Sequence, residues 1–368
     1  MKPNPQAEAQ LKHPEPRAME ILPLLRFAMA VCVVGTHMWR AAFKDAGLHA
    51  VFGFFVISGY LITRITATSY QGRPFSFLLN RFLRIYPQYL TAIALGALVV
   101  VWMPALAKQF NSSLQLPMGA FELLKQLSIF GLRSTNVLLS PPSWSLNVEV
   151  YFYLLIGLLT HRSEVLTYIA LLVSGVMGYL AAVGDTTFGF YGDVLGNAFV
   201  FFLGSSAYFL SRRLHPPRWI GWLMLAVYAV LAFESRRYVT DSPGCYVLLA
   251  LSAFAVAVML IRPPQIRPKF PGAVNFIGRL AYPLFLVHWA CSTPVFAWLG
   301  EQPGARLFFG GMAISLAVAC LMVLGIDLPI EKLRRKVRAA SGHKAVQYES
   351  PAGFTLTSAA VTAMHEIR

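Results

Sequence analysis

The sequence is a succession of long apolar stretches separated by short polar connections. An α-helix needs about 20 apolar residues to cross the hydrocarbon core of a bilayer, so each long stretch is a candidate span. The stretches lie at roughly 20–40, 47–65, 86–107, 145–160, 164–184, 190–210, 218–234, 243–261, 274–299 and 305–328. The pattern predicts an all-α polytopic membrane protein with about ten transmembrane helices. Counts of nine or eleven also fit, because the second, fourth and seventh stretches are short or carry polar groups.

The composition excludes the soluble classes of protein. Of the 368 residues, 57% are hydrophobic and 13% are charged, whereas soluble domains contain about 25% charged residues. So little charge cannot cover a water-facing surface, which rules out a soluble globular enzyme and a disordered chain. Four cysteines are too few for a disulfide scaffold, and all four are expected to be packing thiols within spans.

The positions of the basic residues predict the orientation in the membrane. If the N-terminus is placed in the cytoplasm, 21 lysines and arginines fall in cytoplasmic segments and eight fall in external ones. Cytoplasmic loops carry such an excess of positive charge, so both termini are expected in the cytoplasm. The net charge of +15 is then explained without a nucleic-acid partner.

This orientation divides the chain into three regions. Residues 1–18 are expected to form a cytoplasmic N-terminal segment, residues 19–338 the transmembrane domain and residues 339–368 a cytoplasmic tail. The first span reads as an uncleaved signal anchor, because no signal-peptide cleavage pattern precedes it. The longest external connection, about 108–144, contains an amphipathic stretch around Phe121 that is expected to lie along the membrane interface.

The usual cofactor motifs are absent from the sequence. It contains no phosphate-binding loop, no dinucleotide-binding glycine pattern and no zinc motif, and its histidines never pair at helical spacing. No metal site is therefore expected. Chemistry has to come from ionisable groups inside the spans, which are costly in a bilayer and are functional candidates for that reason.

The first span carries two such groups, Arg26 and His37. A separation of eleven residues is close to three helical turns, so both side chains project from one face, roughly 16 Å apart along the axis. With the chain entering from the cytoplasm, Arg26 lies in the inner part of the membrane and His37 in its outer third. The structural alternative is a snorkelling arginine together with a hydrogen-bonded interfacial histidine.

The fourth span opens with a second polar segment, from Trp144 to Tyr153. Glu149 lies about five residues into this span, roughly 7 Å deep, which is close to the depth expected for His37. A carboxylate and an imidazole at one level would form an oriented general base. In the alternative interpretation, Glu149 caps a broken helix behind two prolines, and Tyr153 belongs to an interfacial aromatic belt.

Further polar groups lie after the second span and in the ninth span. Arg81 and Arg84 are neighbours on one helical face at the cytoplasmic surface, and arginine is well suited to gripping phosphate. Anchoring by the positive-inside rule explains them equally well. His288 lies near mid-membrane in the ninth span, where it fits a structural role as well as a catalytic one.

Five motifs in a fixed order resemble the membrane-bound acyltransferase 3 family. They are the pair Arg26 and His37, the block from Phe54 to Leu61, the run Arg81-x-x-Arg84-Ile85-Tyr86-Pro87, the segment Trp144-Ser145-Leu146 with Glu149 and Tyr153, and Tyr282 with His288. The resemblance covers about residues 20–330, which is nearly the whole chain. The sequence departs from the family pattern at Asn80, where a second arginine is common, and at Asp327, where glutamate is commoner.

The resemblance implies transfer of an acyl group, usually acetyl from cytoplasmic acetyl-CoA, to a sugar hydroxyl of a glycan. His37 would act as the general base or carry the acyl group, and Glu149 would orient an imidazole. The residues implied in donor binding are Arg26, Arg81, Arg84 and Ser58, and those implied in acceptor binding are Trp144, Tyr153 and His288. Ser58 and the glycines of the second span would let the donor arm pass between close-packed helices.

The expected protein is therefore a multi-pass O-acetyltransferase of the bacterial inner membrane that acts on an exported polysaccharide, lipopolysaccharide or related glycan. Its expected partners are a glycan or lipid-linked oligosaccharide acceptor, membrane lipids and polysaccharide assembly proteins. A transporter or flippase with a proton relay through His37, Glu149 and His288 also fits. Against it, the two halves lack a matching pair of Gly/Pro-broken helices. A membrane sensor is a third, weaker alternative.

Overall fold

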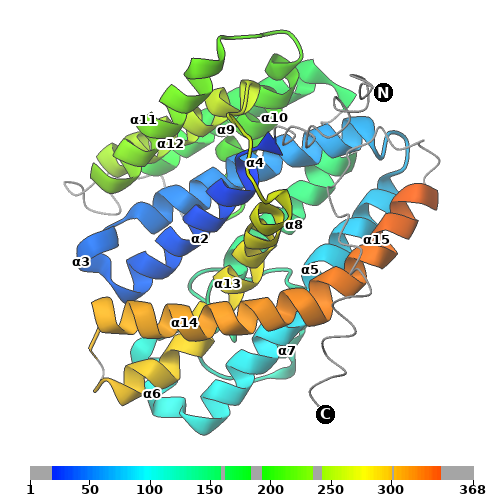
Figure 1. Ribbon diagram of the computed structural model, residues 1–368. Coiled ribbons are helices and arrows are strands. Elements are labelled where there is room, and N and C mark those ends of the chain that lie inside the picture. Colours follow the sequence, from blue (N-terminus) through cyan, green and yellow to red (C-terminus); the bar gives the residue numbers. More distant parts are fainter. Residues whose placement is uncertain (1–18, 159–161, 184–192, 235–242, 301, 341–368) are drawn as a thin grey trace, which may run out of the picture.

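The computed structural model describes residues 19–158, 162–183, 193–234, 243–300 and 302–340 (Figure 1). Ten of its helices match the ten apolar stretches: α2 (Leu22–Met38), α4 (Ala46–Thr68), α5 (Pro74–Trp102), α8 (Ser143–Leu158), α9 (Glu164–Ala182), α10 (Ala198–Ser211), α11 (Arg218–Glu234), α12 (Pro243–Ile261), α13 (Pro271–Trp298) and α14 (Ala305–Met322). The remaining elements are α3 (Arg40–Phe43), α6 (Pro104–Phe110), α7 (Ala120–Ser128), α15 (Leu328–Ala340), the π-helical turn η4 (Val323–Asp327) and the two-residue strands β1 (Met19–Glu20) and β2 (Gln265–Ile266). The predicted helical character is confirmed, apart from the two short strands.

Within the described residues, five helical stretches are long and apolar enough to cross a membrane, namely Ala46–Thr68, Pro74–Trp102, Glu164–Ala181, Pro271–Trp298 and Ala305–Ala339. Three shorter apolar helices accompany them, Leu22–Met38, Ala198–Ser211 and Tyr246–Ile261. These helices are consistent with a multi-pass membrane protein, while the count of ten spans and the cytoplasmic location of both termini stay predictions. The expected N-terminal segment and nearly all of the expected C-terminal tail lie outside the described residues.

Contacts between helix ends define two opposite ends of the molecule. At one end, which we call the sheet end, β1 precedes α2 and pairs antiparallel with β2, which precedes α13. Arg64, near the end of α4, forms an ion pair with Glu20 at the same end. At the opposite end, the backbone N–H of Gly304 before α14 donates to the carbonyl of Met38, the last residue of α2. Helix α2 thus runs from the sheet end to the opposite end, and α4 runs back to the sheet end. This agrees with successive helices that cross the same membrane in opposite directions.

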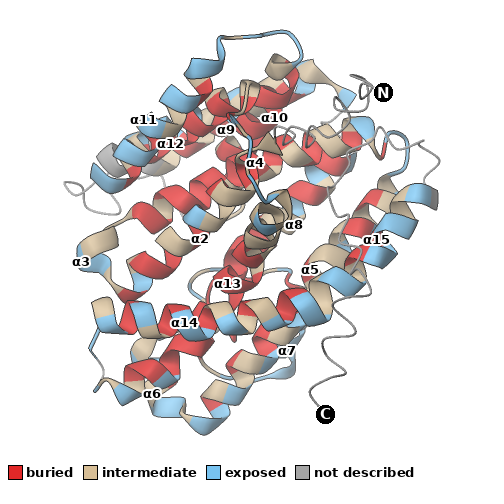
Figure 2. Ribbon diagram, in the orientation of Figure 1, coloured by how far each residue is buried: buried red, intermediate tan, exposed pale blue. Residues whose placement is uncertain are grey.

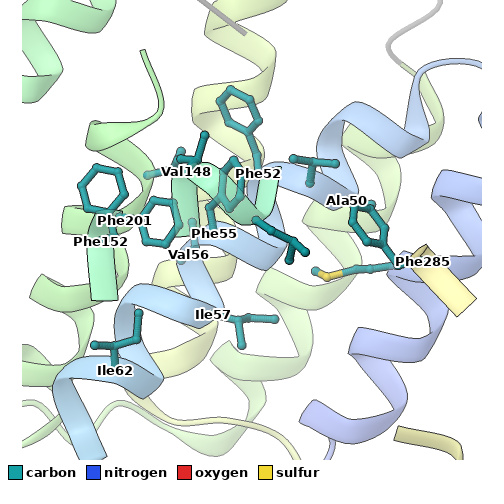
Figure 3. Close-up of a cluster of buried hydrophobic side chains, with 14 of the residues drawn as sticks. Ala50, Phe52, Phe55, Val56, Ile57, Ile62, Val148, Phe152, Phe201 and Phe285 are labelled. Atoms are coloured by element: carbon teal, nitrogen blue, oxygen red, sulfur yellow. The ribbon is translucent and has the colours of Figure 1, made fainter. Parts of the chain in front are cut away.

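Helix α4 lies at the centre of the packing, in contact with α2, α8, α10 and α12 (Figures 1 and 2). Its backbone touches that of α10, because a Cβ atom on Gly59 would clash with the carbonyl oxygen of Phe201. Aromatic and aliphatic side chains from α4, α8 and α10 fill the interior around this contact, including Phe52, Phe55, Val56, Ile57, Ile62, Val148, Phe152 and Phe201 (Figure 3). The buried face of α4 therefore needs a small residue where it meets the backbone of α10, and apolar residues elsewhere.

The last part of the chain between α7 and α8, from Leu138 onward, lies in the interior of the protein. Ser140 is 2% exposed, and the backbone at Leu139 packs directly on Gly96 of α5. The Oγ atom of Ser140 donates a hydrogen bond to the carbonyl of Leu286, in the middle of α13. Helix α8 therefore begins inside the molecule and runs from there toward the sheet end.

Helix α7 itself lies on the outside of the molecule and carries the amphipathic stretch. Phe121 and Leu124 on this helix are 69% and 61% exposed. Its buried residue, Gln126, donates to the carbonyl of Val137, and its own carbonyl accepts from the hydroxyl of Tyr89. These contacts leave the apolar face of α7 uncovered, as expected of a helix at a membrane interface.

Helix α14 continues through η4 into α15, which brings the end of the described chain back to the sheet end (Figure 1). Pro329 has no N–H to donate to the carbonyl of Gly325, which accounts for a widened π-helical turn at this point. Asp327 in the turn forms an ion pair with Arg279 of α13. The turn is thus tied to α13, and α15 packs against α5.

Candidate active site

Three arginines from two helices meet in the half of the molecule nearer the sheet end. Arg26 lies about one turn into α2, and Arg81 and Arg84 lie three residues apart on one face of α5. Arg26 interacts electrostatically with both of the others. We call these three residues the arginine group. Among the residues that the structure describes, no carboxylate forms an ion pair with any of them, so the group favours a bound anion.

A carboxylate lies beside the arginine group without forming an ion pair with it. The Oε1 atom of Glu149 accepts hydrogen bonds from Ser58 Oγ at 2.9 Å and from Tyr153 Oη at 2.6 Å. The guanidinium of Arg81 lies over the ring of Tyr153, 5.7 Å from its centroid, and Glu149 interacts electrostatically with Arg26. The carboxylate is therefore held in one orientation by two donors, one on α4 and one on α8.

The structure corrects the expected position of Glu149. The sequence places it level with His37, as the partner of an imidazole, but its described contacts are with Ser58 and Tyr153. The expectation assumed that α8 starts at the outer surface of the membrane. Because α8 starts inside the molecule, next to Leu286, its second turn lies deeper and reaches the arginine group instead.

Two histidines form a second site near the end of α2. The rings of His37 and His288 stack, with centroids 5.5 Å apart and an interplanar angle of 13°. The ring of Trp289 lies 4.8 Å from that of His37. His288 is completely buried, whereas His37 is exposed. We call His37 and His288 the histidine pair, and its accessible member is His37.

The contacts of His288 define its tautomer. Its Nδ1 atom lies 2.8 Å from the carbonyl oxygen of Phe285, and a carbonyl can only accept, so Nδ1 carries the proton. Nε2 then has a free lone pair, and it is buried with no hydrogen-bond partner among the described residues. His288 is thus an oriented neutral imidazole packed behind the accessible ring of His37.

The other predicted site residues divide between these sites and the core. Ser58 and Tyr153 belong with Glu149 beside the arginine group, although Tyr153 is expected to bind the acceptor. Trp144 lies in the hydrophobic core against Phe55, with ring centroids 6.4 Å apart. The passage of the donor past the glycines of α4 stays a prediction, and at Gly59 the backbone of α10 packs directly on this helix.

Two sets of residues near the sites have no place in the sequence-based prediction. Trp289 contacts His37, and its position directly after His288 is the only signal in the sequence. Arg334 and Glu331 on α15 lie next to the start of α5. Sequence reasoning counts the basic residues of α15 only as positive-inside charge, although Arg334 is 6% exposed.

The arrangement separates two chemical capabilities along α2. The arginine group can bind a phosphorylated molecule through charge-assisted hydrogen bonds. The histidine pair offers an accessible imidazole that can accept a proton. Arg26 and His37 lie on one face of the same helix, roughly 16 Å apart by helical rise, so α2 fixes the separation between the two sites.

Comparison with known proteins gives a family match and a relative. Residues 20–324 match the family model described as "Acyltransferase domain". A Komagataeibacter xylinus protein named "Putative membrane-bound transacylase BcsY" is 25% identical over 335 residues, which cover 85% of this chain and 83% of that protein. No solved structure matches the chain. The family match ends before α15 begins.

Proposed function

Since the chain belongs to the acyltransferase 3 family and is a membrane acyltransferase, we propose that it moves acetyl from cytoplasmic acetyl-CoA to a sugar hydroxyl. The proposed acceptor is an exported surface polysaccharide, lipopolysaccharide or related glycan, and the proposed location is the bacterial inner membrane. The observation that carries this proposal is the arginine group, which has no ion-pair partner among the described residues and whose member Arg26 shares a helix face with His37.

The donor end of the proposal rests on the chemistry of coenzyme A. Its diphosphate and ribose phosphate are anions, and its pantetheine arm carries the thioester at the far end. Arg26, Arg81 and Arg84 supply the planar donors that suit phosphate. With the phosphates at this group, the extended arm points along α2 toward the histidine pair.

The acceptor end places the reacting hydroxyl at His37. In a direct transfer, the imidazole takes the proton of the sugar hydroxyl while the sugar oxygen attacks the thioester carbonyl. The carbon–sulfur bond then breaks, and the thiolate of coenzyme A leaves and takes up a proton. In the alternative, the imidazole nitrogen attacks first and hands the acetyl group to the sugar in a second step. His288 packs behind His37 and orients it in both schemes.

The transporter alternative is less well supported. A proton relay needs His37, Glu149 and His288 in a connected row. The two histidines stack on each other, but the hydrogen bonds of Glu149 run to Ser58 and Tyr153. The carboxylate of Glu149 therefore lies beside the arginine group, and none of its described hydrogen bonds connects it to the two histidines.

The test uses the full chain in sealed proteoliposomes that contain radiolabelled acetyl-CoA, with a lipid-linked oligosaccharide or polysaccharide added outside. We expect labelled acetyl esters on the external glycan. Arg26→Lys keeps the charge and loses the two-pronged hydrogen bonding, so it should raise the KM for acetyl-CoA and retain part of the kcat.

A matched variant, Arg212→Lys, changes an exposed arginine at the end of α10 and should behave as the wild type. A flippase would move the lipid-linked sugar across the bilayer without making an acetyl ester, and this result would refute the proposal. Transfer only to an acceptor enclosed with the donor would refute the division of the two substrates between the two sides.

A further inference from the structure

Helix α15 inserts a buried arginine beside the arginine group. The guanidinium of Arg334 donates to Asn80 Oδ1 through Nε at 3.3 Å and through Nη2 at 3.2 Å. The amide of Asn80 donates in return to the backbone carbonyl of Arg334 at 3.2 Å. Asn80 is 1% exposed, so this reciprocal contact is shielded from water and holds the guanidinium in one orientation.

The contact with Asn80 places Arg334 next to Arg84. Residues 80 and 84 are one helical turn apart on α5, so their side chains lie on the same face. Arg334 interacts electrostatically with both Arg84 and Arg81. Arg334 thus extends the arginine group by one helical turn toward the sheet end.

The charge around Arg334 is only partly balanced. Glu331 forms ion pairs with Arg334 at 2.7 Å, with Arg335 at 3.6 Å and with Arg338 at 2.5 Å. One carboxylate therefore faces three arginines of its own helix, while the neighbouring Arg84 has no ion pair within the described part of the chain. A cluster with this surplus of positive charge is stabilised by an anion.

We propose that Arg334 is a fourth arginine of the donor site and that it binds the phosphate farthest from the thioester, the 3′-phosphate of the ribose. This inference rests on the proposed function. The thioester end points toward His37, so the opposite end of coenzyme A lies one turn of α5 closer to the sheet end than Arg84, where Asn80 holds Arg334. Asn80 is a positioning residue, since it acts through the guanidinium.

The first test compares two ligands on the wild-type chain. Purified full-length protein in detergent is heated with coenzyme A or with dephospho-coenzyme A, which lacks only the 3′-phosphate. Coenzyme A should raise the Tm more than dephospho-coenzyme A does at the same concentration. Equal stabilisation by the two ligands would overturn the proposal without the need for any variant.

The second test removes the guanidinium. A hydrogen bond to a charged group is worth about 1.5–3 kcal/mol, so Arg334→Met should raise the KM for acetyl-CoA by roughly 10-fold or more. The kcat with acetyl-CoA should stay unchanged, and so should the KM for acetyl-dephospho-CoA. Arg334→Lys should recover part of the affinity, and Asn80→Ala should produce a smaller change of the same kind.

Arg335→Met is the matched control, because Arg335 is on the same helix, contacts the same carboxylate and is about half exposed. It should keep the wild-type KM for both donors. If Arg334→Met instead raises both KM values equally, Arg334 only docks α15 and the proposal fails. If acetyl transfer is never observed but coenzyme A stabilises the chain through Arg334, the proposed function fails and the anion site stands.

Discussion

At the scale of single residues, His37 is the side chain on which the proposed chemistry depends most. It is the accessible member of the histidine pair, and it lies three turns from Arg26 on the same helix face. We expect His37→Ala to lower the rate of acetyl transfer by about 10²–10⁴-fold, the usual contribution of a positioned general base. The measurement is the initial rate of glycan acetylation by the purified variant.

The matched control is His215→Ala, which changes an exposed histidine in the connection between α10 and α11. It should acetylate at the wild-type rate. Both variants should accumulate in the membrane, since the histidine of a membrane span tends to cost stability and His215 is an exposed residue of a connection. A His37→Ala protein that acetylates at nearly the wild-type rate would remove His37 from the mechanism.

Glu149 offers a second prediction at this scale. Glu149→Gln keeps an oxygen that can accept from both Ser58 and Tyr153, so the local structure should persist. It removes a negative charge beside Arg26, which should make the arginine group more attractive to anions. We expect coenzyme A to bind several-fold more tightly, as measured by titration calorimetry.

The control for Glu149 is Glu122→Gln, an exposed carboxylate on α7, a helix that carries none of the predicted site residues, and this variant should leave the affinity unchanged. If Glu149 served an imidazole instead, its loss would lower kcat and leave the Kd for coenzyme A as it was. That outcome would contradict the grouping of Glu149 with the arginines.

At the scale of elements, the contact between α4 and α10 depends on two glycines, Gly59 on α4 and Gly204 on α10. A Cβ on Gly59 would clash with the backbone of Phe201, which cannot move aside as a flexible side chain can. We expect Gly59→Ala to lower the free energy of unfolding by about 1–3 kcal/mol. Thermal unfolding of the purified protein in detergent measures the effect.

The comparison for this variant is Gly175→Ala on α9, where a Cβ would meet the ring of Phe199 at an ordinary distance of 3.4 Å. Alanine is favoured over glycine inside a helix by about 0.5–1 kcal/mol. This second variant should therefore be neutral or slightly more stable. Equal losses in both variants would show that α4 and α10 are not in direct backbone contact.

At the scale of the whole molecule, the orientation in the membrane is open to a direct test. The helix ends alternate between the sheet end and the Met38 end, and the basic residues predict that the sheet end faces the cytoplasm. A phosphatase fused after Asn111 should therefore be active, and one fused at Pro216 should be inactive. The opposite pattern would invert the molecule and place His37 on the cytoplasmic side.

The sequence alone was sufficient to predict the helices. Ten apolar stretches became ten helices, because an apolar run of this length satisfies its backbone hydrogen bonds only within a helix. The pairing of Arg26 and His37 on one face also followed from the sequence, since helical periodicity fixes the relation of residues within one helix. The family resemblance likewise needed only the order of local motifs.

What only the tertiary structure decided is how residues on different helices meet. Glu149 joined the arginines because the segment before α8 is buried and starts that helix deep inside the molecule. Arg334 reached Asn80 across 254 residues because a π-helical turn carries α15 back onto α5. Periodicity describes one helix at a time, whereas the depth and rotation of each helix against its neighbours are set by packing across the whole chain.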